Sequence, residues 1–75
     1  MIISHFIRRA RLIKGLTRLQ LDGAIGARKG TVGSWEQGRA RPQAKWLAPL
    51  SDVLGVTIET MVDSYLEQEN PEFTQ

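Results

Sequence analysis

The apolar residues of this chain recur every three to four positions, which is the period of an amphipathic α-helix. Short segments that contain glycine or polar residues interrupt this pattern, and no stretch alternates with a period of two. The pattern therefore predicts an all-α fold, a compact five-helix domain without a sheet. The predicted helices cover residues 4–14, 18–25, 28–37 and 43–54, and the fifth follows a cap at residue 57.

The residue types at the predicted helix ends support these boundaries. Ser4 is the expected N-cap of the first helix, and residues 17–20, Thr-Arg-Leu-Gln, fit a capping box for the second. Gly26 suits the left-handed turn that follows, because glycine adopts a positive φ without strain. Pro49 lies inside the fourth predicted helix, where a proline removes a hydrogen bond. That helix is therefore either kinked near Lys45 or starts later than usual.

Two short helices, a tight glycine turn and a basic loop before the next helix are the layout of a DNA-binding helix-turn-helix. The charges agree with this interpretation. From Arg8 to Lys45 there are ten basic residues against two acids, a net charge of +8. From Trp46 to the end there is no basic residue against six acids, a net charge of −6. A basic front half suits a phosphate backbone, and the acidic rear is expected to face away from it.

Composition argues against several other classes of protein. The chain has no cysteine and a single histidine, His5, with no carboxylate cluster near it. We therefore expect no disulfide, no metal site and no cofactor. No nucleophile–base pair or glycine-rich phosphate loop is present, so the protein is not expected to be an enzyme. Arg8 interrupts the N-terminal apolar stretch, and no apolar run approaches the ~18 residues of a membrane span. We expect a soluble, cytoplasmic protein without membrane contact.

A set of residues with a characteristic joint spacing extends from about residue 7 to residue 62. Its members are Arg11, Lys14-Gly15-Leu16-Thr17, Leu21, Gly26, Trp35-Glu36 with Gly38, Pro42, and Leu54-Gly55-Val56. In this spacing the chain resembles the Cro and lambda-repressor type of helix-turn-helix family. The resemblance implies a lambda-repressor-like five-helix domain that binds operator DNA, usually as a symmetric dimer. We expect this domain to span residues 1–67, and residues 68–75 to form an acidic, flexible tail.

The start of the third predicted helix is expected to contact base edges. The candidate base-reading residues are Arg28, Lys29, Thr31 and Ser34. Arginine and lysine reach the guanine acceptors, and the short hydroxyl side chains can touch a base edge, a thymine methyl or a phosphate. Gly30 and Gly33 fall on the same predicted face and have no side chain. Either the helix backbone sits very close to the bases and DNA shape contributes to the readout, or base reading has been lost and the domain binds a protein.

A second group of residues is expected to contact phosphates. Its members are Arg18, Gln37, Arg39, Arg41 and Lys45. The first of these opens the second helix, where free N–H groups and the helix dipole favour an anion. By resemblance, the two arginines after the third helix clamp phosphates beside the groove, and Arg11 forms a structural ion pair with Glu36. Asp22 stands where the family has an alanine. Its charge is expected to turn outward or to pair with Arg28 or Lys29.

The chain has more apolar residues than the core of so small a domain can bury, and exposed apolar patches usually contact a partner. We expect a homodimer interface through the fifth helix and the end of the fourth, at Trp46, Ile58, Met61 and Tyr65. The sequence thus predicts a sequence-specific, DNA-binding transcription regulator of the repressor type, prokaryotic or phage-borne, that binds double-stranded DNA. The alternative is a protein-interaction module on the same fold, such as an antitoxin or an adaptor with a protein partner.

Overall fold

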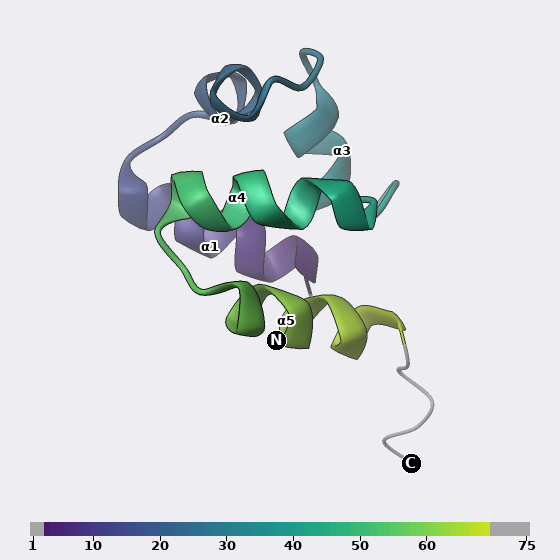
Figure 1. The fold of residues 1–75 in the computed structure, drawn as a ribbon. Coiled ribbons are helices and arrows are strands. Elements are labelled where there is room, and N and C mark those ends of the chain that lie inside the picture. The colour runs from purple at the N-terminus through teal and green to yellow at the C-terminus, as the bar shows by residue number, and fades with distance from the viewer. Residues whose placement is uncertain (1–2, 70–75) are drawn as a thin grey trace.

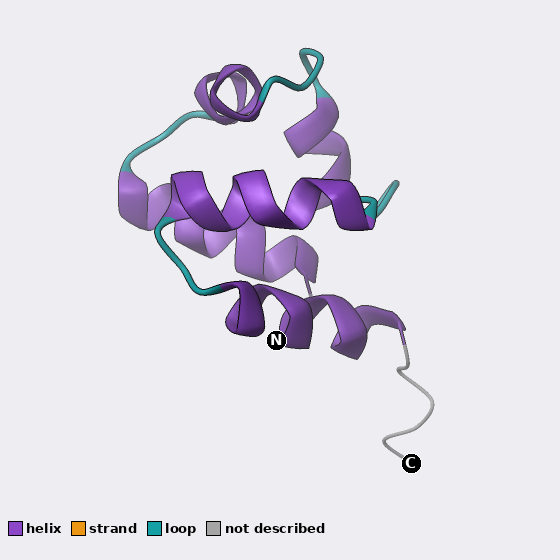
Figure 2. Ribbon diagram, in the orientation of Figure 1, coloured by secondary structure: helices purple, strands orange, loops and turns teal. Residues whose placement is uncertain are grey.

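The computed structural model describes residues 3–69, and the side chains of all of these except residues 65 and 67–69. Within that range the chain forms five α-helices and one short 3-10 helix, with no strand (Figure 2). The elements are α1 (Ile3–Lys14), α2 (Arg18–Ile25), α3 (Thr31–Glu36), the 3-10 helix η1 (Ala44–Trp46), α4 (Leu47–Leu54) and α5 (Ile58–Glu69). The prediction of an all-α, five-helix fold is confirmed. In the described part of the chain, no helix is long and apolar enough to cross a membrane.

The helices pack around one core. In Figure 1, α4 crosses the middle of the molecule, with α2 and α3 above it, α1 behind it and α5 below. α1 packs against α3, α4 and α5, and α2 packs against α3 and α4. The buried core consists of Ile3, Ile7, Ala10, Leu21, Ile25, Val32, Trp35, Leu47, Leu50, Leu54 and Met61. Every α-helix contributes to this list, so the α2–α3 pair is held on the rest of the molecule by a continuous apolar cluster.

The two ends of α2 agree with the prediction. The hydroxyl oxygen of Thr17 accepts a hydrogen bond from the Gln20 backbone N–H at 3.0 Å, and the Thr17 N–H donates to the Gln20 side chain at 2.8 Å. These two bonds complete the capping box. Gly26 follows with φ +76°, in the left-handed region, and ends the helix.

The start of α1 differs from the prediction, and the start of α4 decides between the two alternatives for Pro49. Ser4 is not an N-cap, because α1 already includes Ile3 and Ser4 is buried inside the helix. α4 begins at Leu47, later than the pattern suggested, and η1 covers the preceding three residues. Pro49 is therefore the third residue of α4. N–H groups of a first helical turn have no intrahelical partner, so proline costs no hydrogen bond there.

The predicted third helix was too long at both ends. α3 contains six residues, and Gly30 precedes it with φ +93°. A backbone with that φ is outside the helical region and strained for any residue with a side chain. Arg28 and Lys29 therefore lie in the turn before α3 rather than in its first helical turn.

The C-terminal helix corrects part of the predicted dimer interface. Met61 has no exposed surface and belongs to the core, so it was wrong to place it on an interface. Trp46 is half-buried, and its ring packs against Trp35 with 5.8 Å between ring centroids. Ile58 remains 46% exposed. The side chain of Tyr65 and residues 70–75 of the predicted tail lie outside the described residues, while α5 continues two residues beyond the predicted boundary at residue 67.

Candidate nucleic-acid interface

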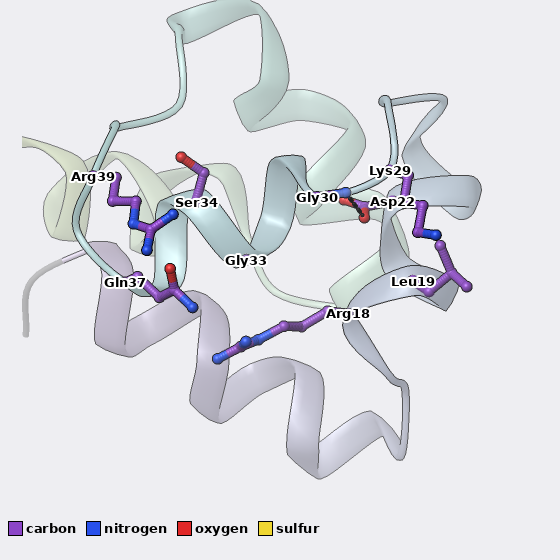
Figure 3. Close-up of a pocket in the computed structure, with 9 residues that line it drawn as sticks. All are labelled: Arg18, Leu19, Asp22, Lys29, Gly30, Gly33, Ser34, Gln37 and Arg39. Atoms are coloured by element: carbon purple, nitrogen blue, oxygen red, sulfur yellow. Dashed lines mark hydrogen bonds between the residues drawn. The ribbon is translucent and has the colours of Figure 1, made fainter.

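A hollow of about 390 Å³ lies between α2 and α3 (Figure 3). It is lined by Arg18, Leu19, Asp22, Lys29, Gly30, Gly33, Ser34, Gln37 and Arg39. Three of these residues are basic. The single acid, Asp22, is only 2% exposed. The accessible charge around the hollow is therefore positive.

This hollow brings together residues from both predicted groups. Figure 3 shows Ser34, Gln37 and Arg39 on one side of Gly33, and Lys29 on the other. Lys29 and Ser34 were expected to read bases, whereas Gln37 and Arg39 were expected to contact phosphates. Gly33 lies between these side chains and has none of its own.

The remaining predicted residues line a second hollow, of about 400 Å³. Its lining includes Arg28, Thr31, Arg41 and Lys45, together with the rings of Trp35 and Trp46. The ammonium group of Lys45 lies 5.4 Å from the centroid of the Trp46 ring, within the range of a cation–π contact. Thr31 and Trp35, one helical turn apart, line the second hollow. Gly33 and Ser34 line the first hollow, on the other side of α3. α3 is thus a ridge between two hollows, and each hollow has basic residues on its rim.

Arg18 is positioned by a contact that the sequence did not predict. Its Nε donates to Oε1 of Glu36 at 3.1 Å, and its side chain is 45% exposed. A Cβ atom added at Gly33 would lie 3.6 Å from Cδ of Arg18, so the arginine extends along the bare surface of α3. The absence of a side chain at residue 33 leaves room for that path. Arg18 therefore joins the start of α2 to the end of α3.

Glu36 is held mainly by Arg11. Arg11 donates from Nε to Oε2 at 2.6 Å and from Nη2 to Oε1 at 3.0 Å, and its Nη1 donates to the carbonyl of Leu16 at 2.8 Å. The Glu36 side chain is fully buried. Burial alone would raise the pKa of Glu36, but the hydrogen bonds from Arg11 and Arg18 outweigh this effect and lower it. The hydrogen bond to Glu36 raises the pKa of Arg11 in turn. One carboxylate therefore connects α1, α2 and α3.

Asp22 corrects a second prediction. Its carboxylate neither turns outward nor pairs with a basic side chain. Oδ2 accepts from the Gly30 N–H at 2.9 Å, and Oδ1 accepts from the Val32 N–H at 2.8 Å. An acid on α2 thus caps the amino end of α3, where free N–H groups favour a negative charge. The sequence held one signal for this role: the turn before Thr31 contains no serine, threonine, aspartate or asparagine to cap the helix locally.

The carboxylates of Asp22 and Glu36, which lie beside α3, both accept hydrogen bonds. Asp22 accepts from backbone N–H groups, and Glu36 accepts from arginines. Among residues 3–69, no three or more His, Cys, Asp or Glu side chains are grouped as they would be to hold a metal ion. The lining of the two hollows therefore presents positive charge and hydrogen-bond donors.

Comparison with known proteins identifies a family to which this arrangement of helices corresponds. A protein-family model described as a helix-turn-helix domain matches residues 2–63. The match includes α1 to α4, the start of α5 and the lining of both hollows. No curated protein matches the chain.

Proposed function

Because the chain belongs to the helix-turn-helix domain family, a family of DNA-binding domains, we propose that it is a sequence-specific transcription regulator of the repressor type. In this proposal α3 enters the major groove of operator DNA. The observation that carries it is the ridge formed by α3 between two hollows with basic rims. A major groove about 12 Å wide admits one α-helix, and its phosphates then lie beside the helix on both sides.

The two sides of α3 suggest a division of roles. Base edges would be approached by α3 and the turn before it. This part of the chain carries Lys29 and Ser34 on one side, and Arg28 and Thr31 on the other. The arginine and the lysine can donate to guanine O6 and N7. Four further residues, Gln37, Arg39, Arg41 and Lys45, follow α3 and would contact phosphates on either side of the groove. Phosphate contacts set the register of the protein on DNA without reading sequence.

The bare surface of α3 also fits this function. Gly30 and Gly33 line the first hollow without side chains, so the helix backbone can approach the bases more closely than a helix with long side chains could. Fewer direct base contacts then remain on each protomer. We propose that two protomers bind a pseudo-palindromic site with their α3 helices about 34 Å apart, which doubles the number of base contacts.

Two measurements test the proposal. Selection from a random DNA pool is expected to return a two-fold symmetric site. Affinity for that site and for random duplex is then measured against salt concentration, and a steep fall is expected, because each neutralised phosphate contributes about −0.9 to the slope of log K against log salt. K29A is expected to weaken binding of the selected site and relax one base position, whereas R39A is expected to weaken all duplexes equally and flatten the slope by ~1. A chain that selects no sequence and shows no salt dependence would refute the proposal.

A protein-interaction module on the same fold remains the second candidate. It is favoured by the exposed apolar side chains of Leu12, Ile13 and Leu19, of which 56%, 77% and 58% of the surface is accessible. Such a module would bind a partner protein and show almost no salt-dependent affinity for DNA. The salt titration above therefore separates the two functions.

A further inference from the structure

The outer face of α1 is apolar and basic, and it takes no part in the two hollows beside α3. Leu12 and Ile13 are the most exposed large apolar residues of this helix, and Arg8 and Arg9 are exposed next to them. A hollow of about 230 Å³ lies at the same face, lined by Phe6, Arg9, Ala10, Ile13 and Val56. All but one of these lining residues are apolar, so the hollow suits an aliphatic side chain.

The outer face of α5 has the complementary character. Ile58 and Leu66 are 46% and 48% exposed, and Glu59 and Asp63 are exposed between them. α1 and α5 both contain twelve residues. α1 has no acid and exposes the basic residues Arg8, Arg9 and Lys14, while its remaining arginine is buried against Glu36. α5 has no basic residue and exposes Glu59 and Asp63. Each helix therefore matches the other in length, in apolar positions and in opposite charge.

We propose that these two faces form a self-complementary interface between two copies of this chain, with α1 of each protomer against α5 of its partner. α1 and α5 pack side by side within one protomer, so a two-fold axis can satisfy both contacts at once. An interface of α5 against α5 would instead oppose the acids Glu59 and Asp63 of both copies. An interface of α1 against α1 would oppose Arg8 and Arg9. Like charges that face each other in an interface weaken it, so the mixed pairing is favoured.

This inference rests on the proposed function, in which two protomers bind one DNA site, and it names the interface between them. It replaces the interface that was expected from the sequence. Met61, one of the expected interface residues, is buried in the core. The residues of the new interface line neither hollow beside α3. Both α3 helices of a dimer would therefore remain accessible.

The test is sedimentation equilibrium of the full chain without DNA, so that its result does not depend on DNA binding. The wild type is expected to dimerise reversibly, and more weakly at high salt. The variant R8E/R9E and the variant E59K/D63K are each expected to weaken dimerisation about tenfold or more. Combining all four changes in one chain restores opposite charges at both contacts and is expected to restore the dimer. R39E, which reverses a charge beside α3, is the matched control and should dimerise like the wild type.

Three results would overturn the inference. One is a wild type that stays monomeric at all concentrations; another is a dimer that R8E/R9E leaves unchanged. The third is a fourfold variant that has the circular dichroism spectrum of the wild type and remains monomeric. Binding of the wild type to its selected DNA site is measured separately, so a failure of this interface and a failure of the proposed function give different results.

Discussion

The carboxylate of Asp22 offers the sharpest single test of how α3 is held in place. α3 has six residues, one of which is glycine, and no side chain of its own turn caps it. Isolated helices of this length are not stable in water. Its amino end instead donates the Gly30 and Val32 N–H groups to Asp22 on α2. Removing this carboxylate by D22A should therefore loosen the amino end of α3.

The magnitude follows from the two hydrogen bonds. A hydrogen bond to a charged acceptor contributes about 1.5–3 kcal/mol, and the loss of an N-cap costs about 0.5–2 kcal/mol. Gly30 is exposed, so water can replace the carboxylate there, whereas Val32 is fully buried. We expect D22A to lower the free energy of unfolding by about 2–4 kcal/mol. A domain of this size has about 4–11 kcal/mol in total, so the variant should be folded but clearly weakened.

The effect on DNA binding has two opposite parts. D22A removes a negative charge from a basic face, which favours random duplex slightly. It also lets α3 fray, which reduces affinity for the selected site. The ratio of specific to random binding should therefore fall, even if affinity for random DNA rises.

Denaturant unfolding followed by circular dichroism measures the stability change, and amide hydrogen exchange locates it at Val32. D22N is the matched control. Its side-chain oxygen can still accept from Val32, but its amide nitrogen cannot accept from Gly30, so about half of the loss is expected. If D22A unfolds within about 0.5 kcal/mol of the wild type, and exchange at Val32 is unchanged, the carboxylate does not hold α3 and this reasoning is wrong.

Three further predictions concern Glu36, Gly33 and Met61. The folded pKa of Glu36 lies below its ordinary value of 4.5, so its stabilising effect is complete above about pH 4.5 and is lost as the pH falls through the lower, folded pKa. E36Q should abolish that acid dependence and cost about 3–5 kcal/mol at neutral pH, measured by denaturant unfolding. G33A should stabilise the fold by about 0.5–1 kcal/mol, because its Cβ makes only ordinary contact with Arg18. It should nevertheless weaken the selected DNA complex; undiminished affinity would show that the helix backbone does not approach the bases closely. M61E should unfold the domain rather than dissociate a folded dimer, because Met61 is buried in the core. Circular dichroism would show the loss of helix on unfolding, whereas sedimentation would show the dissociation of a dimer that stays folded.

Local signals in the sequence were sufficient for the elements whose ends are set by neighbouring residues. The capping box of Thr17 and Gln20 and the left-handed turn at Gly26 both involve bonds across at most five residues. The spacing of apolar residues also identified the helices, since burial of one face requires that spacing. The same kind of reasoning allowed two positions for the start of α4, because Pro49 is compatible with either.

Features that depend on residues far apart in the chain could not be predicted in this way. Asp22 was expected to turn outward or to pair with Arg28 or Lys29. Its actual role as an acceptor requires the amide groups of residues 30 and 32, which only the packing of α2 on α3 brings near. Met61 and Ile58 look alike in the helical pattern, yet one is buried and the other is 46% exposed. The contact of Arg18 with Glu36 likewise joins residues eighteen positions apart, which only the packing of α2 on α3 brings together.

In the proposed complex with DNA, the position of Arg18 bears on the entropy of binding. A free arginine side chain has about 2 kcal/mol of rotamer entropy, and most of this is lost when it fixes on a phosphate. In this protein Glu36 already orders the guanidinium through its hydrogen bond from Nε. Much of that ordering therefore takes place when the chain folds, before DNA arrives. A calorimetric comparison with R18K, whose flexible ammonium lacks the planar fork, is expected to show a larger entropic penalty on binding for the lysine.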